Sequence, residues 1–190
     1  MMDALELLKT RRSVTAAFLG LPVPDRRQLE EMLTIASRVP DHGKLSPWRF
    51  IVFEGDARLA AGEALAALYA RQHPDADEKK CDEERKRLAI APLVVAVVSK
   101  AAPHVKIPEW EQLLSAGNAA LSLSLAAYAL GFHANWTTGW AAYEPEAGEI
   151  LGLAPGERVI AFVHVGTATV PITDRPRPAL ADIVTYWKAP

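Results

Sequence analysis

Apolar residues recur along this chain at intervals that predict helices alternating with strands. Leu29, Met32 and Ala36 lie three and four residues apart, as on one side of a helix. Asp25 and Gln28, just before them, have the spacing of a capping box, which satisfies free N–H groups at a helix N-terminus. The pattern therefore predicts a helix that begins after Asp25 and ends at about Ser37.

Other elements follow from similar patterns. Apolar, β-branched runs at 49–53, 91–99 and 158–165 predict strands, and 132–139 predicts a strand or a strand entry. The run 91–99 carries no charge, so we expect a central strand that is buried on both faces. Helices are predicted from a capping-box spacing at Asp3 and Glu6, from Asp56 with Leu59, Leu65 and Leu68 on one side, and over 74–87, 108–130 and 145–151.

The order of these elements predicts a mixed α/β sandwich built as a single domain over residues 1–190. A chain of this length, half of it apolar, can bury one compact core. A Rossmann domain needs Gly-x-Gly-x-x-Gly after its first strand, and a P-loop protein needs a Walker sequence; neither is present. The proline-rich tail ends in an apolar stretch between Ile183 and Trp187, so we expect an arm that packs on a distant surface, such as another subunit.

The segment 113–132 carries no charge and is long enough to cross a bilayer. It is dominated by Ala, Ser and Gly and includes Asn118, so its hydrophobicity is weak and a buried helix is the better interpretation. No basic and apolar leader begins the chain, and a single cysteine, Cys81, excludes an internal disulfide. We therefore expect a cytoplasmic protein without a membrane segment.

The charge balance favours neither nucleic acid nor an anionic membrane as a partner. Lys and Arg total 21 against 23 Asp and Glu, so the formal charge is −2 and no global field attracts such partners. The histidines have no mutual metal-ligand spacing, and Cys81 has no CxxC partner. We expect no metal site.

Arg11, Arg12 and Ser13 lie where the first predicted helix gives way to an extended segment. Two guanidinium groups and a hydroxyl are the donors that a phosphate prefers. The alternative is that arginines in a last helical turn complement the helix dipole. From these residues alone, both interpretations stay open.

A second polar block, residues 38–48, reads Arg-Val-Pro-Asp-His-Gly-Lys-Leu-Ser-Pro-Trp and predicts a structured loop. In such a loop, Asp41 can simply accept backbone N–H bonds in a turn. Asp41 and His42 could also belong to a hydrolase triad, but no Gly-x-Ser-x-Gly elbow accompanies them.

Both blocks resemble the nitroreductase family of FMN-dependent oxidoreductases, especially its small members, and the resemblance spans nearly the whole chain. The opening helix with Arg11-Arg12-Ser13 is similar to the family's start, and 38–48 is similar to its Pro-Trp segment. Residues 135–139 and the tail around 174–178 resemble later blocks of the family. The resemblance implies an α+β fold, with a central, mostly antiparallel sheet flanked by helices and a C-terminal arm exchanged in a homodimer.

The resemblance also implies FMN sites at the interface of that homodimer. Arg38 and His42 would reach the FMN bound by the other subunit, and Arg175 or Arg177 would meet the phosphate. The implied FMN-binding residues are Arg11, Arg12, Ser13, Arg38, His42, Trp136, Thr137, Thr138, Arg175 and Arg177. The implied nicotinamide side is Ala126, Ala127, Tyr128, Ala129, Leu130 and Gly131, which helix packing explains equally well.

By the same resemblance, the chain is an NAD(P)H oxidoreductase. A hydride would pass from NAD(P)H to N5 of FMN, and electrons would then pass to a nitroaromatic, a quinone or a similar small acceptor. FMN carries this chemistry, so we expect no catalytic protein side chain. The alternative is a carrier or sensor that binds flavin without turnover. Reductive dehalogenation and flavin destruction are further family activities, but they usually need lids or inserts for which this chain has little room.

Overall fold

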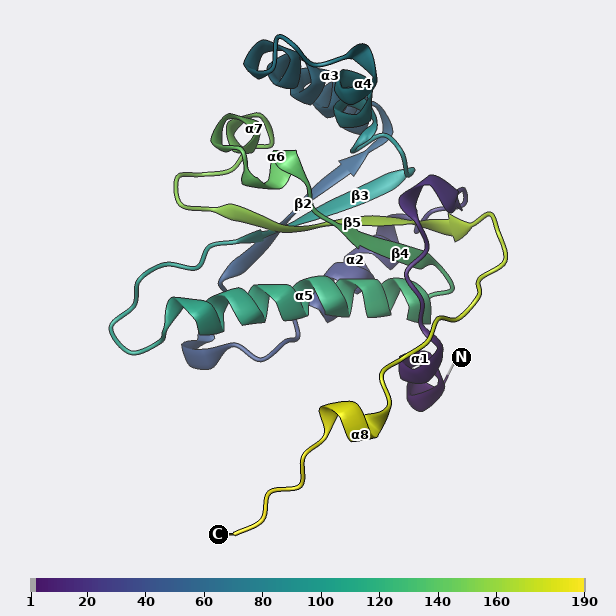
Figure 1. Ribbon diagram of the computed structural model, residues 1–190, viewed down its shortest axis with the longest axis vertical. Helices are drawn as coiled ribbons and strands as arrows, with labels where there is room; N and C mark the ends of the chain where they lie inside the picture. The colour runs from purple at the N-terminus through teal and green to yellow at the C-terminus, as the bar shows by residue number, and fades with distance from the viewer. Residues whose placement is uncertain (1–2, 190) are drawn as a thin grey trace.

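The computed structural model describes residues 3–189 (Figure 1). The helices are α1 (Ala4–Thr10), α2 (Arg26–Ala36), α3 (Gly55–Gln72), α4 (Glu78–Lys86), α5 (Glu109–Ala129), α6 (Trp140–Tyr143), α7 (Pro145–Ile150) and α8 (Leu180–Ile183). The strands are β1 (Leu19–Gly20), β2 (Trp48–Glu54), β3 (Leu93–Ser99), β4 (His133–Thr137) and β5 (Arg158–Ala168). Two 3-10 turns, η1 (Ala16–Phe18) and η2 (His42–Lys44), complete the order.

The strands form one sheet in the order β1-β5-β3-β2, with β4 paired to β5. Every pairing in the described part of the chain is antiparallel. β3 pairs with β2 from Leu93 to Ser99 and with β5 on its other side, and all of its residues are buried. The central strand expected at 91–99 is therefore confirmed, as is the antiparallel α+β architecture.

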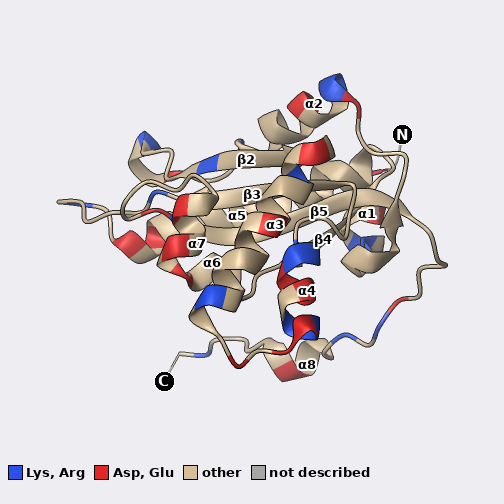
Figure 2. Ribbon diagram, turned by 90° about the horizontal axis from the view of Figure 1, so that it is seen from above, with Lys and Arg blue, Asp and Glu red and all other residues tan. Residues whose placement is uncertain are grey.

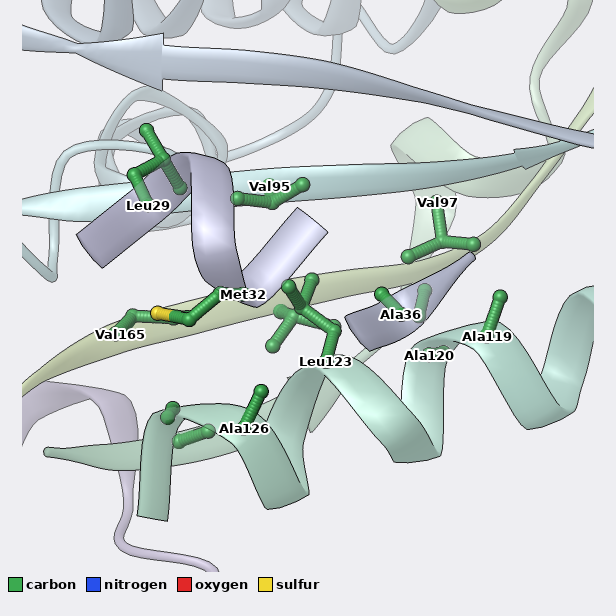
Figure 3. Close-up of a cluster of buried hydrophobic side chains, with 14 of the residues drawn as sticks. Leu29, Met32, Ala36, Val95, Val97, Ala119, Ala120, Leu123, Ala126 and Val165 are labelled. Carbon is green, nitrogen blue, oxygen red and sulfur yellow. The ribbon is translucent and has the colours of Figure 1, made fainter. Parts of the chain in front are cut away.

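Helices cover both faces of the sheet, with α2 and α5 on one face and α3, α6 and α7 on the other (Figure 1). Because side chains alternate along a strand, Val95 and Val97 face the first layer while Val94 and Val98 face the second. Figure 3 shows the first layer, in which the labelled side chains of α2 and α5 point at the sheet. Each face thus has its own apolar core.

The predicted capping box of α2 is confirmed. Asp25 Oδ1 accepts a hydrogen bond from Gln28 N at 2.8 Å, and Gln28 Oε1 accepts one from Asp25 N at 3.0 Å. The capping box predicted at the start of α1 is wrong, because the Asp3 side chain makes no cap hydrogen bond. Asp3 is exposed, so water can satisfy the free N–H groups there. The sequence pattern also missed α6, which is too short to show a period.

The charged segment 74–87 contains α4, a solvated helix with ion pairs, as expected. Arg85 lies 3.2 Å from Asp82 within the helix and 3.1 Å from Glu63 of α3, and Lys86 also pairs with Asp82. Figure 2 shows both signs of charge interleaved along α4. α3 packs closely on α4, because a Cβ on Gly62 would lie only 2.2 Å from the Arg85 carbonyl oxygen.

The long helix α5 lies along the sheet and ends at Ala129. Gly131, two residues later, has a φ of 86°, the left-handed conformation expected after a helix C-terminus. Ala116, Ala119, Ala120 and Ala127 are fully buried, and these small side chains let α2 approach closely. None of the helices within residues 3–189 combines the length and apolar character that crossing a membrane requires.

The C-terminal arm begins after β5, and every residue from Thr169 to Ala189 is exposed. It passes α1 and runs away from the body beneath α5, carrying the short helix α8 (Figure 1). Its apolar side chains stay open to solvent, with Leu180, Tyr186 and Trp187 each more than 70% exposed. The apolar side chains at the end of the arm are therefore left uncovered by the protomer.

Candidate functional site

The segment after α1 is joined to the start of β4. Val14 N donates a hydrogen bond to Ala134 O at 3.2 Å, although the two residues are far apart in sequence. Arg11 and Arg12 are half-buried beside this junction, and Ser13 is exposed, with its Oγ 3.4 Å from Arg11 Nη2. The junction places the predicted phosphate residues next to the strand that leads to Trp136, Thr137 and Thr138.

Arg12 also faces the beginning of the C-terminal arm. Its Nε donates to Thr173 O at 3.1 Å and lies 3.7 Å from Asp174 Oδ1. A hollow of about 290 Å³, which we call the Arg12 hollow, opens at this place. It is lined by Lys9, Thr10, Arg12, Tyr128, Ile172 and Asp174. Segments from both ends of the chain and the last turn of α5 therefore meet around two cationic side chains.

The two arginines of the tail lie just beyond this hollow, and both are exposed. Arg177 Nη2 lies 3.2 Å from Asp174 Oδ1, so Asp174 faces Arg12 and Arg177 together. Arg175 is the neighbour of Asp174 in sequence. Both arginines are thus close to Arg12 along the arm, and the geometry does not favour one of them over the other.

The loop that carries Arg38 and His42 lies elsewhere in the protomer. Asp41 accepts hydrogen bonds from Leu45 N at 3.0 Å and Ser46 N at 2.9 Å, which is the turn role expected as the alternative to catalysis. Ser115 of α5 donates to Pro40 O and fixes the same loop from outside. This framework leaves His42 exposed.

Within one protomer, α5 separates this loop from the Arg12 hollow. His42 Nδ1 lies 2.8 Å from Oε2 of Glu111 in the first turn of α5, whereas Tyr128 in its last turn lines the hollow. Glu111 and Tyr128 are 17 positions apart, which spans about 26 Å along a helix at 1.5 Å per residue. A single protomer does not bring the two predicted halves of the site together.

The third predicted segment, Trp136 to Thr138, begins two residues after Ala134, which accepts the hydrogen bond from Val14 N. Trp136 is 42% exposed, and its Nε1 donates to Ile160 O at 3.2 Å. Thr137 and Thr138 are half-buried, and the Thr137 hydroxyl lies 3.0 Å from Nε2 of His164. β4 pairs only with β5 in the described sheet, so this segment lies at an open sheet edge.

His164 is a buried neutral base beneath this segment. It is 2% exposed, and burial together with the nearby charge of Arg87 lowers its pKa to about 4. Its Nδ1 has no hydrogen-bond partner within residues 3–189. A neutral ring that donates from Nε2 to Thr137 leaves only an acceptor unpaired at Nδ1, which costs less than an unpaired donor or a charge.

Half-buried Arg87 and buried Glu84 form an ion pair here, which the sequence did not single out. Arg87 Nε donates to Glu84 Oε2 at 2.6 Å, and Nη2 pairs with Glu84 Oε1. The remaining Nη1 donates to Thr138 O at 3.0 Å. Arg87 stands at the end of a charged run, and Thr138 follows 51 residues later, so no local signal joined them.

The predicted nicotinamide segment is the last turn of α5 with its C-cap. Ala126 and Ala127 have buried side chains in the apolar core, whereas Ala129 and Gly131 are exposed. The Tyr128 ring meets the ring of His133 edge-on at 4.9 Å, and burial lowers the pKa of His133. Only the exposed part of this segment offers surface to a ligand.

A larger hollow, of about 650 Å³, lies between α6, α7 and the start of β5. Tyr143, Leu153 and Ile160 are among its lining residues, and none of the predicted site residues lines it. Its size alone gives no reason to prefer it over the Arg12 hollow, where cationic donors converge.

Comparisons with known proteins find similar sequences over most of the chain. The family model described as "Nitroreductase family" matches residues 8–167. The chain is 38% identical over 168 residues to a protein of Escherichia coli named "Putative NAD(P)H nitroreductase YdjA", covering 87% of this chain and 88% of that protein. A similarly named protein of Haemophilus influenzae is 41% identical over 167 residues, covering 87% of this chain and 89% of its own.

Solved structures share the fold at lower identity. A nitroreductase-like family protein from Bacillus cereus superposes with a TM-score of 0.83 at 20% identity, covering 100% of this chain and 98% of its own. A variant of the FMN and NADPH-dependent nitroreductase NfnB from Sphigopyxis sp. strain HMH gives 0.75 at 22% identity, covering 97% and 99%. The fold that the resemblance implied for one protomer, an antiparallel sheet flanked by helices, is confirmed.

Proposed function

Since this chain belongs to the nitroreductase family, we propose that it is a cytoplasmic FMN-dependent oxidoreductase that takes a hydride from NAD(P)H. The electron acceptor would be a small molecule such as a nitroaromatic or a quinone. The single observation that carries this proposal is the hydrogen bond between Val14 N and Ala134 O, because it unites the phosphate-binding candidates with the Trp136–Thr138 segment.

The residues present fit FMN. Lys9 and Arg12 line the hollow, and Arg11 and Ser13 lie beside it, so cationic donors and a hydroxyl suit a phosphate. The segment that follows β4 offers a backbone N–H to the polar edge of a flavin ring, since no residue between 3 and 189 accepts a hydrogen bond from Gly139 N. Arg11 and Arg12 would hold the phosphate, and residues 136–139 would hold the ring.

A homodimer would complete each site. Trp110, Leu114 and Leu121 are 60%, 57% and 41% exposed and form a stripe along α5, a surface that a monomer would leave in water. In a twofold pair with antiparallel α5 helices, the first turn of one helix lies beside the last turn of the other. His42 and Arg38 of one subunit would then approach the Arg12 hollow of its partner.

The arm supports the same assembly. Its exposed side chains at Leu180, Ile183 and Trp187 cannot be covered within one protomer, whereas a partner below α5 lies in the direction that the arm takes (Figure 1). We therefore propose that the arms are exchanged between the subunits. Arg12 anchors the base of the arm through Thr173 O.

The protein's own part in the reaction is to bind and orient. When bound, FMN supplies the hydride and electron transfer. Arg11 and Arg12 neutralise the phosphate, residues 136–139 donate hydrogen bonds to the ring edge, and the exposed surface near Ala129 and Gly131 admits the nicotinamide. Donors held in place before the reaction stabilise the negative charge of a reduced ring without reorganising.

The visible absorption spectrum of the purified protein, followed by FMN titration, tests the cofactor assignment. We expect flavin absorption and tight rebinding after removal; a colourless protein that does not bind added FMN would contradict the proposal. NADH and NADPH oxidation with a nitroaromatic acceptor then separates an enzyme from a flavin carrier, which would bind FMN without turnover.

A further inference from the structure

We propose that Arg87, held by Glu84, is a positioning residue that turns the Thr138–Gly139 peptide so that its N–H is presented to the ring of the bound flavin. The inference rests on the proposed function, because it needs FMN at the open edge of β4. It assigns a role to an ion pair that family membership does not explain.

The first step is the geometry of the guanidinium. Arg87 uses Nε and Nη2 on the Glu84 carboxylate, and Glu84 has a side chain only 8% exposed. A guanidinium held at two points cannot rotate, so its third donor direction is fixed. That third donor, Nη1, meets Thr138 O at 3.0 Å.

The second step is the planarity of the peptide. The C=O and N–H of one trans peptide point in opposite directions, so a Thr138 carbonyl that faces Arg87 sends the Gly139 N–H away from α4. This N–H donates to no acceptor among residues 3–189. Charge-assisted bonding at the carbonyl also polarises the peptide and makes the free N–H a stronger donor.

The third step is the close approach that glycine permits. Gly139 has a φ of 138°, a conformation that other residues rarely adopt, and a Cβ there would lie 2.2 Å from Arg87 Nη1. The backbone and the guanidinium therefore touch directly, without a side chain between them. The positive φ of Gly139 and its lack of a Cβ both favour glycine beside Arg87.

The neighbouring peptide is fixed from another side. The Thr137 hydroxyl lies 3.0 Å from His164 Nε2 on β5, and Trp136 Nε1 donates to Ile160 O. The segment is therefore held at three successive residues before any ligand arrives. Preorganised backbone donors of this kind discriminate between charge states of a ligand more than flexible ones do.

The test combines NMR of the Gly139 amide with flavin binding. Glycine-selective ¹⁵N labelling gives 11 candidate signals. Added ¹³C-carbonyl labelling of threonine assigns Gly139, because Thr138-Gly139 is the only Thr-Gly pair in the sequence. The double variant Glu84→Gln/Arg87→Gln removes both charges without leaving an unpaired buried carboxylate. The control is Arg85→Gln, which breaks ion pairs of the same helix with Glu63 and Asp82 but does not contact Thr138.

In the parent protein and the Arg85→Gln control, we expect added FMN to shift the Gly139 amide signal strongly. In the double variant, we expect that signal to move already without ligand. The affinity for reduced FMN should fall about tenfold more than the affinity for oxidised FMN, which lowers the two-electron midpoint potential by about 30 mV. A purely structural ion pair would leave the potential unchanged, although removal of Arg87 would still shift the neighbouring amide signal.

Failure of this inference and failure of the proposed function look different. If the parent binds FMN but the double variant matches the Arg85→Gln control in potential, the role of Arg87 is overturned while the function stands. If the double variant does not fold, a Gly139 amide that stays unmoved when FMN binds the parent overturns it equally. If the parent binds no FMN, the proposed function itself fails and the inference falls with it.

Discussion

The imidazole Nδ1 of His42 lies 2.8 Å from Oε2 of Glu111, and this contact ties the η2 turn to the first turn of α5. Because the Arg12 hollow lies at the other end of the same helix, a His42 that serves an FMN site must serve the site of a second subunit. The pair is exposed enough to contribute little stability, since surface ion pairs are worth at most about 1 kcal/mol. We expect the contact with Glu111 to orient the His42 side chain.

Mixed dimers test this arrangement directly. We expect His42→Ala and Arg11→Ala homodimers each to bind FMN weakly at both sites, since every site lacks one residue. A heterodimer of the two variants contains one site with both residues and one with neither, so mixing and reassociation should restore tight binding at one site per dimer. FMN titration of the mixture, with the separate variants as controls, measures this recovery. No recovery would contradict sites shared between subunits.

The exposed stripe of α5 should determine the oligomeric state. Leu121→Asp places a charge in the proposed interface, so we expect sedimentation equilibrium to show monomers with unchanged secondary structure. Leu59→Asp is the matched control, because Leu59 is exposed to a similar degree, 46% against 41%, but lies on α3 across the sheet. If both variants remain dimers, α5 is not the interface.

The sequence located those elements whose pattern is set by burial alone. β3 is a continuous apolar run buried at every residue, and α2 is capped by adjacent groups, so local sequence contains the whole signal. The capping box at Asp3 failed because spacing shows only that two side chains can reach each other, not that they do. α6, with four residues, has no period to read.

The candidate site likewise contains residues that the sequence could reveal and residues that it could not. Arg11, Arg12 and Ser13 could be proposed from sequence because three suitable donors are contiguous. Arg87 could not, because its partner Thr138 is distant in sequence and Arg87 looks like one more charge at the end of a charged run. His164 was hidden in a strand, where its contact with Thr137 depends on the register of β4 against β5.

Arg11→Ala should weaken FMN binding without unfolding the protein. A charge-assisted hydrogen bond to a phosphate contributes about 1.5–3 kcal/mol, so we expect the Kd to rise roughly 10- to 100-fold. Arg27→Ala, on the exposed side of α2, is the matched control and should leave the Kd unchanged. Fluorescence titration with FMN measures both; equal affinities in the two variants would exclude Arg11 from the site.

Gly62→Ala should destabilise the packing of α3 on α4. A Cβ at Gly62 would lie 2.2 Å from the Arg85 carbonyl oxygen, and backbone cannot give way as a side chain can, so we expect a loss of about 1–3 kcal/mol in the free energy of unfolding. Gly148→Ala in α7 meets only ordinary contacts at 3.6 Å and should be neutral or slightly stabilising. Urea unfolding of both variants decides; a neutral Gly62→Ala would mean that the helices are less closely packed.

His164 should make stability fall as the solution is acidified. Its pKa is about 4 in the folded protein and about 6.5 when unfolded. Between these values the unfolded chain binds the extra proton, so the free energy of unfolding decreases as the pH falls. From pH 7 to pH 5 we expect a loss of about 2 kcal/mol from this group.

His164→Gln should flatten the profile, leaving a smaller slope in the same direction from His133, whose pKa is also lowered by burial. The matched control is His73→Gln, at an exposed residue, which should keep the full slope in urea titrations at each pH. If His164→Gln and the parent lose stability in parallel, His164 does not carry the acid sensitivity.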